Sequence, residues 1–209
     1  MSAVVVTHPV LAHRVAQLRD RVTDGDTFRR LIGEVSGLLA YEALRDLGTA
    51  EVVVDTPVVG GAAATRVSEV VLLVPILRAG LGMIPAVQAI VPLTEVAHVG
   101  LRRDEATLQS VIYLDKLPHD LRGRRVVVCD PMLATGGSLA QVCDLLVERG
   151  AARITALCLL VSEPGLEAFE ARHPEVTVYC TALDPALNDV GFIVPGLGDA
   201  GDRLFGPPA

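Results

Sequence analysis

The sequence predicts an α/β fold in which a mostly parallel sheet is flanked by helices, and three observations lead to it. Segments rich in Val, Ile and Leu alternate with segments of helical periodicity from Ser68 onward. These strand segments are continuously apolar, which is typical of parallel strands covered on both faces. The 209 residues contain no internal repeat or low-complexity linker, and this length suits a single domain over residues 1–209.

The N-terminal part is expected to be a helical arm over residues 1–50. Its clearest element is an amphipathic stretch from Thr27 to Leu47. Asp26 or Thr27 is a suitable N-terminal cap, and Gly48 is a suitable stop. No chemistry is evident in the segment Gly37–Ala43 of this arm, so we expect that segment to pack or to dimerise.

The rest of the chain is expected to supply the sheet and its covering helices. The expected strands are Ser68–Leu77, Glu95–Leu101, Arg125–Cys129 and Ile154–Val161, and the expected helices are Met83–Ile90 and Ser138–Arg149. In such sheets, ligands bind beyond the carboxyl ends of the strands. We therefore expect the site to be bordered by Arg78–Gly82, Arg102–Asp115, Asp130–Gly137 and Asp184–Gly201.

Composition excludes several classes of protein. The formal net charge is −7 and aromatic residues make up only 3%, which argues against a nucleic-acid-binding surface. No apolar run approaches the ~20 residues of a membrane span, and residues 1–14 lack the pattern of a signal peptide. We expect a cytoplasmic protein that binds neither nucleic acid nor membrane.

The cysteines and histidines predict no metal site built from protein side chains. Cys129, Cys143, Cys158 and Cys180 each lie in or beside an apolar segment, and none forms a CxxC pair. Buried, reduced thiols are therefore expected. The five histidines show no spacing typical of metal ligands.

The most informative local pattern is residues 126–138, where a strand, a glycine-containing loop and a helix follow one another. Gly136 and Gly137 allow a close approach of the backbone, and a helix N-terminus favours phosphate. The loop has neither Gly-Lys-Ser/Thr nor GxGxxG, so nucleoside-triphosphate and dinucleotide loops are excluded. Asp130, at the strand end, suits sugar hydroxyls or a cation. The pattern favours a sugar phosphate; the alternative is an ordinary capped turn.

Residues 130–138, Asp-Pro-Met-Leu-Ala-Thr-Gly-Gly-Ser, resemble the phosphoribosyl pyrophosphate (PRPP) motif of type I phosphoribosyltransferases. Pro131, in place of a second acidic residue, resembles the uracil phosphoribosyltransferase branch. The resemblance implies that PRPP is bound by Asp130, Pro131, Met132, Leu133, Ala134, Thr135, Gly136, Gly137 and Ser138.

Two further segments resemble PRPP-binding parts of this family. Val74–Met83 is a strand that enters a glycine-interrupted turn, which suits an anion even without the resemblance, and the resemblance makes Arg78 a PRPP ligand. The resemblance also makes Arg103 a PRPP contact and Thr107–Lys116 a flap over the site. The alternatives are a structural turn and a solvated charge cluster.

The C-terminal segment, residues 184–209, is expected to be a base-binding extension. Gly191–Gly206 resembles the uracil-binding loop of the family. The resemblance makes Ile193, Gly198, Asp199 and Ala200 base contacts, with Asp199 also near PRPP. A loop rich in glycine suits a small flat base, because main-chain groups can then read its edge at close range. The alternative is a flexible tail.

The resemblance implies conversion of uracil and PRPP to UMP and pyrophosphate in pyrimidine salvage, with Arg78, Arg103, Asp130 and Asp199 as catalytic residues. It further implies Mg²⁺ bound mainly through PRPP, a homodimer or higher homo-oligomer, and GTP as a candidate activator. Two alternatives remain: a phosphoribosyltransferase for another base, and an RNA-binding regulator on the same fold. The acidic charge and scarce aromatics oppose the second.

Overall fold

The computed structural model describes residues 3–103 and 110–207, without the side chains of Arg103 and Ser110. Its central sheet has the strand order β1 (Ala3–Val5), β12 (Thr177–Cys180), β10 (Arg153–Leu157), β8 (Arg125–Cys129), β4 (Val71–Leu77), β6 (Val99–Arg103) and β7 (Ser110–Asp115). A further strand, β5 (Thr94–Val96), also pairs with β4. All pairings are parallel except β6 with β7, which confirms the predicted fold class.

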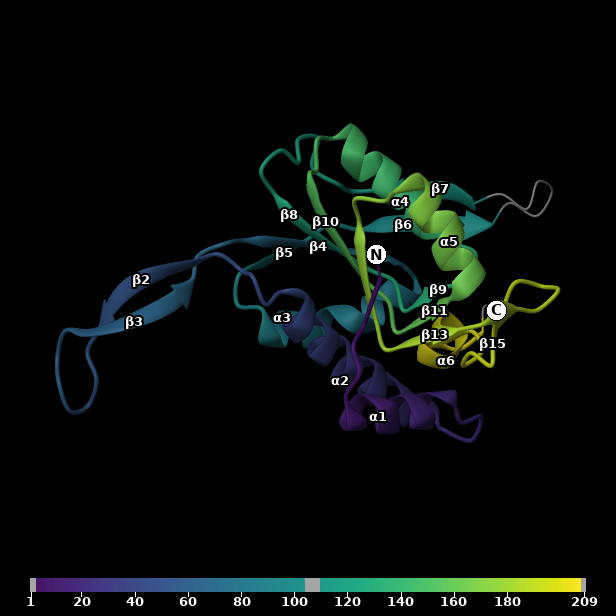
Figure 1. Ribbon diagram of the computed structural model, residues 1–209, viewed down its shortest axis with the longest axis horizontal. Helices are drawn as coiled ribbons and strands as arrows, with labels where there is room; N and C mark the ends of the chain where they lie inside the picture. Colours follow the sequence, from purple (N-terminus) through teal and green to yellow (C-terminus); the bar gives the residue numbers. More distant parts are fainter. Residues whose placement is uncertain (1–2, 104–109, 208–209) are drawn as a thin grey trace.

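Helices cover both faces of this sheet (Figure 1). One face carries α1 (Pro9–Arg19), α2 (Gly25–Ala43) and α3 (Ile84–Ile90), and the other carries α4 (Gly137–Glu148) and α5 (Glu163–Arg172). Successive strand residues face opposite cores: Leu73 packs in the first core, whereas Leu72 and Val74 pack in the second. Burial on both faces explains why the strands are continuously apolar.

Smaller elements surround the sheet. Three short parallel strands, β9 (Met132–Leu133), β11 (Leu160–Ser162) and β13 (Ala182–Asp184), lie near the carboxyl ends of the main strands. The C-terminal segment contains the antiparallel pair β14 (Ala186–Leu187) and β15 (Ile193–Val194), followed by helix α6 (Ala200–Phe205). A hairpin of β2 (Thr49–Val54) and β3 (Ala62–Val67) projects from the body (Figure 1).

The prediction of a helical arm over residues 1–50 is wrong at both ends. Residues 3–5 form β1, which extends the sheet beside β12, and residue 49 begins β2. The amphipathic helix is α2, and its cap is Asp24, whose side chain accepts a hydrogen bond from the Thr27 N–H at 2.9 Å. The helix ends at Ala43, before the predicted stop.

Two predicted strands are each divided in two. Glu95–Leu101 becomes the two strands β5 and β6. The Ala97 N–H still donates to the Leu73 carbonyl of β4 at 3.0 Å. The next donor along β4 would be residue 75, but this residue is Pro75 and has no N–H, so the ladder is interrupted here. Ile154–Val161 becomes β10 and β11 because the chain bends at Leu159, where the N–H groups of Leu159 and Leu160 both donate to the Pro131 carbonyl. The strand 125–129 is as predicted.

The remaining boundaries differ slightly. The strand predicted from Ser68 begins at Val71, and the helix predicted from Met83 begins at Ile84, after a 3₁₀ turn over Ala79–Met83. All four cysteines are free and buried, as predicted. Among the helices of the described residues, none is long and apolar enough to cross a membrane.

Candidate active site

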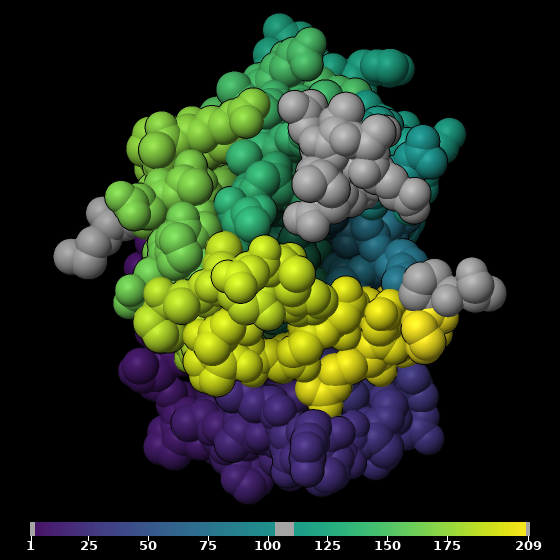
Figure 2. Space-filling view, turned by 90° about the vertical axis from the view of Figure 1, so that its right-hand side faces the viewer, coloured from purple at the N-terminus to yellow at the C-terminus, as the bar shows by residue number. Residues whose placement is uncertain are grey.

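Two adjoining cavities lie at the carboxyl end of β8, beneath the C-terminal segment. The larger cavity, of about 280 Å³, and the smaller cavity, of about 170 Å³, share four lining residues: Asp130, Met132, Ala134 and Gly191. Figure 2 shows this side of the molecule, with the C-terminal segment in yellow between the sheet region and the N-terminal helices. A ligand with two parts can therefore occupy both cavities at once.

The smaller cavity lies at the N-terminus of α4 and is suited to an anion. Thr135, Gly136 and Ser138 line it. Gly136 is the N-cap of α4 with φ +78°, and no side chain caps this helix end. A Cβ on Gly136 would lie 2.6 Å from the Gly165 carbonyl oxygen, so a larger residue does not fit. Helix N–H groups without a side-chain cap and two hydroxyl groups have the chemistry that suits a phosphate.

Asp130 lies where the two cavities meet. It directly follows β8, and its Oδ1 is 3.4 Å from the Met132 nitrogen, a long hydrogen bond. Burial raises the pKa of the Asp130 carboxyl to about 7, because desolvation disfavours the charged form. A carboxylate in this place is available to hydroxyl groups of a ligand that spans the cavities.

The larger cavity is lined mainly by the C-terminal segment. All four predicted base contacts line it: Ile193, Gly198, Asp199 and Ala200. Ile193 and Ala200 are buried, whereas Gly198 is exposed with φ +82°. Asp199 is the N-cap of α6, with its Oδ1 2.8 Å from the Asp202 nitrogen.

Several residues that line the cavities were not predicted individually. They are Ala79, Leu139, Val190, Gly191, Phe192 and Gly201. Most of them lie inside segments expected to border the site. An alanine or a valine has no chemical group that would show from the sequence whether it lines a cavity or packs in the core.

Three predicted PRPP ligands line neither cavity. Arg78 is half exposed and pairs with Asp202, although its neighbour Ala79 lines the larger cavity. Pro131 is buried and supports the loop through its carbonyl, and Gly137 is the first residue of α4.

Parts of the predicted flap lie outside the described residues. Residues 107–109 belong to the range that the structure does not describe, and for Arg103 only the backbone, at the end of β6, is described. The described part is residues 110–116, of which Ser110–Asp115 form β7 and pair antiparallel with β6.

The fold, with a glycine-containing loop after β8 and a second cavity under a C-terminal extension, is that of a type I phosphoribosyltransferase. A hypoxanthine-guanine phosphoribosyltransferase from Bacillus anthracis shares this fold with a TM-score of 0.52 at 14% identity, over 77% of this chain and 80% of that chain. The family model described as uracil phosphoribosyltransferase matches residues 5–207. This chain belongs to the uracil phosphoribosyltransferase family, as the sequence resemblance predicts.

The similarity to individual relatives extends over nearly the full length of the chain. The chain is 49% identical to a uracil phosphoribosyltransferase of Clostridium perfringens over 201 residues, which is 96% of each sequence. Its structure matches that of the AQ2163 protein from Aquifex aeolicus with a TM-score of 0.91 at 36% identity, over 98% of each chain.

Proposed function

We propose that this protein is a pentosyltransferase that converts uracil and PRPP to UMP and pyrophosphate. The observation that carries the proposal is the pair of adjoining cavities that share Asp130. One has the helix end and hydroxyls that a phosphate requires, and the other has a volume of about 280 Å³ and a lining that includes three glycines, which suit a small flat base. The name shared by close relatives supports the same reaction.

The phosphoribosyl part is held by the loop of residues 130–138. The 5′-phosphate accepts hydrogen bonds from the N-terminus of α4 and from the hydroxyls of Thr135 and Ser138. Asp130 accepts hydrogen bonds from the ribose hydroxyls. Met132, Leu133 and Ala134 line the smaller cavity. Pro131 and Gly137 determine the backbone conformation of the loop.

The base occupies the larger cavity. Ile193, Gly198 and Ala200 present main-chain groups to it, and Asp199 lies beside both base and PRPP. Arg78 and Arg103 bind the pyrophosphate, which leaves with the electron pair of the ribose C1–O bond as C1 bonds to uracil N1 and the N1 proton is released. Catalysis therefore consists of positioning and electrostatic stabilisation, with no side-chain nucleophile.

The residues present fit a magnesium ion that arrives with PRPP. Within the described part of the chain, no three His, Cys, Asp or Glu side chains gather into a metal site. Asp130 and Asp199 nevertheless both line the larger cavity and offer the carboxylate oxygens that Mg²⁺ prefers. The ion, bound mainly through PRPP, would neutralise charge that develops on the leaving pyrophosphate.

The test is UMP formation by the purified protein from uracil, PRPP and Mg²⁺, with cytosine, hypoxanthine and guanine in parallel reactions. Uracil should be the base that is used. Turnover of another base would favour a phosphoribosyltransferase of different specificity. Absence of turnover together with tight, specific RNA binding would favour the regulator alternative.

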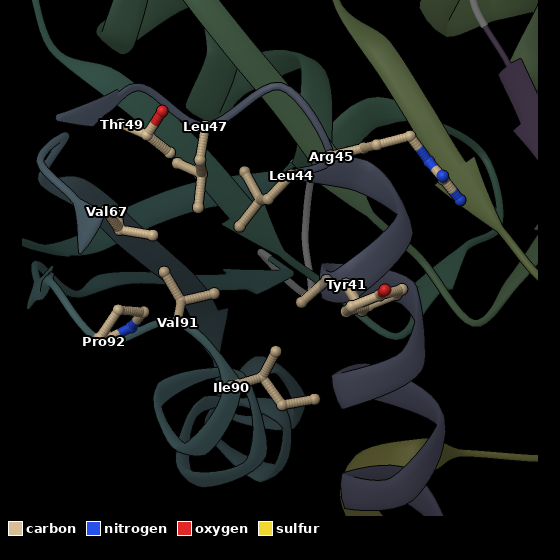
Figure 3. Close-up of a pocket in the computed structure, with 10 residues that line it drawn as sticks. Tyr41, Leu44, Arg45, Leu47, Thr49, Val67, Ile90, Val91 and Pro92 are labelled. Atoms are coloured by element: carbon tan, nitrogen blue, oxygen red, sulfur yellow. The ribbon is translucent and has the colours of Figure 1, made fainter. Parts of the chain in front are cut away.

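We also propose that the protein is a homodimer or a higher homo-oligomer, joined through an apolar surface on α2, α3 and the β2–β3 hairpin. One groove in this surface, shown in Figure 3, is lined by Tyr41, Leu44, Leu47, Val67, Ile90, Val91 and Pro92 among others. Ile90 also lines a neighbouring groove with Leu38, Pro85 and Ala86. The continuity of the two grooves, and the marginal stability of a lone hairpin in water, support a second copy as the occupant.

Sedimentation measurements test this assembly. Leu38→Glu places a charge in the apolar surface and should shift the protein toward the monomer. Val22→Glu is the matched control, because Val22 is also exposed but lines neither groove. A monomeric wild-type protein would refute the proposed assembly.

GTP as an activator is a proposal that rests on family resemblance, whereas a cytoplasmic location is a proposal that rests on composition. Initial rates with and without GTP test the first, and an activator should raise the rate at subsaturating PRPP. Cell fractionation tests the second. The observation that bears on location is compositional: the chain is acidic and its apolar runs are short.

A further inference from the structure

We propose that Arg19 and Asp184 are positioning residues for the base loop, residues 193–200, and that they control affinity for uracil without touching it. Arg19 is the last residue of α1, and Asp184 is the last residue of β13. The inference rests on the proposed function, because it assumes that uracil occupies the larger cavity. It gives the N-terminal helix a role in base recognition.

The two side chains form a bidentate ion pair. Arg19 Nη1 donates to Asp184 Oδ2 at 2.7 Å, and Arg19 Nη2 donates to Asp184 Oδ1 at 2.6 Å. The exposed fraction is 22% for the arginine side chain and 5% for the aspartate side chain. In a buried ion pair, the polar atoms that the pair itself does not use also need hydrogen-bond partners. The backbone of the base loop provides them.

Both members of the pair bind the backbone of the same residue, Gly196. The Gly196 N–H donates to Asp184 Oδ2 at 3.0 Å, and Arg19 Nη1 donates to the Gly196 carbonyl at 2.9 Å. Gly196 has φ +60°, and a Cβ there would lie 2.1 Å from the Ile193 carbonyl oxygen. The ion pair therefore fixes both polar groups at the tight turn between Ile193 and Gly198.

A second arginine holds the next carbonyl of the turn. Arg203 Nη1 donates to the Leu197 carbonyl at 2.9 Å, and Arg203 Nη2 donates to the Asp20 carbonyl at 2.8 Å. Its guanidinium also lies 4.1 Å above the centre of the Phe28 ring. The turn is thus tied to the N-terminal helices, which lie directly beneath the C-terminal segment (Figure 2).

This arrangement affects the base rather than the phosphoribosyl group. Ile193 and Gly198, which flank the turn, line the larger cavity but not the smaller one. Main-chain recognition requires the loop backbone to be held within a fraction of an ångström. Loosening the turn should therefore weaken binding of uracil and leave the phosphate loop after β8 undisturbed.

The experiment compares Arg19→Lys and Asp184→Asn with the wild-type enzyme. The lysine keeps the charge but loses the bidentate contact, and the amide loses one acceptor. We expect kcat/KM for uracil to fall about 10-fold or more, as for a small misplacement of a bound substrate. The value of kcat/KM for PRPP at saturating uracil should change less than about threefold.

Arg125→Lys is the matched control. Arg125 is also a buried arginine in an ion pair, with Asp46 and with Glu69 at 3.5 Å, but it lies at the start of β8, the end opposite the site. This variant should lower the melting temperature without a selective change in uracil kinetics.

Equal losses for uracil and PRPP, or a lowered melting temperature alone as in Arg125→Lys, would overturn the proposal. If Asp184→Asn does not fold, the milder Arg19→Lys decides the question. A wild-type protein that makes no UMP would refute the proposed function instead, so the two failures are distinguishable.

Discussion

Arg78 and Asp202 form an ion pair, with Nη2 and Oδ1 2.9 Å apart, that joins the end of β4 to helix α6. The pair links the predicted pyrophosphate loop to the C-terminal segment that lines the larger cavity. Both side chains are partly exposed, at 47% and 38%, and pairs of this kind contribute little to stability. The arginine is therefore available to a polyanionic ligand at small cost to the fold.

Replacing Arg78 by Ala should weaken the use of PRPP by about 2–4 kcal/mol in kcat/KM, as for a charged donor lost from a closed site. The melting temperature should change little, since the pair is exposed. Arg103→Ala is expected to behave in the same way. Steady-state kinetics with varied PRPP provide the measurement, and normal kinetics in both variants would remove these arginines from the site.

Replacing Asp130 by Asn should keep the fold and abolish most activity. The carboxylate can accept two hydroxyl donors, whereas the amide presents a donor on one side. Circular dichroism checks the fold, and single-turnover kinetics with saturating PRPP check the chemical step. Normal turnover by this variant would instead make Asp130 a turn residue whose role ends at its contact with Met132.

The raised pKa of Asp130 predicts that a rise in pH increases the activity of the enzyme but decreases the stability of its fold. Because the carboxyl titrates at about 7 in the free protein, kcat/KM for PRPP should rise with pH through this value. The folded-state pKa lies above the ordinary value of 3.8, so the protonated group favours the folded state. That contribution is fully present below pH 3.8 and is lost as pH rises through about 7.

Asp130→Asn separates these effects. At pH 8 the amide avoids a buried charge, so the variant should be more stable than the wild type, on the order of 1–2 kcal/mol. At pH 4 the difference should nearly vanish. Thermal unfolding of both proteins at the two pH values gives the comparison, and equal stability at pH 8 would mean that the carboxylate is well solvated.

The sequence correctly predicted the elements whose structure depends mainly on residues close to one another in the chain. The strand Arg125–Cys129 contains the apolar run Val126–Cys129 between two charged residues, and α4 shows clear helical periodicity. The loop between them contains the residue types that a phosphate needs. All of these features depend on residues within a few positions of one another.

Features that depend on distant partners could not be predicted in this way. The strand β1 exists because β12, more than 170 positions later, offers an edge for residues 3–5. The interruption between β5 and β6 depends on Pro75 in the neighbouring strand. Arg19 likewise shows no distinguishing pattern in the sequence, and its role becomes visible only when Asp184 is placed beside it.

Selectivity for uracil over cytosine should follow from hydrogen-bond polarity in the larger cavity. Uracil presents an acceptor at O4 and a donor at N3–H, and cytosine presents the reverse along this edge. If main-chain N–H and C=O groups of residues 193–200 bind the uracil edge, cytosine leaves two buried groups unpaired, at about 1–3 kcal/mol each. A preference for uracil of about 10³-fold or more in kcat/KM is therefore expected.

Two substitutions separate main-chain from side-chain recognition. Ile193→Val keeps the backbone and a buried apolar side chain, so the preference should hardly change. Gly198→Ala should damage it, because Gly198 has φ +82°, a conformation that residues with a Cβ rarely adopt. The measurement is kcat/KM for both bases in all three proteins. Comparable use of both bases by the wild type would refute main-chain recognition, and an unimpaired Gly198→Ala variant would place the base away from this loop.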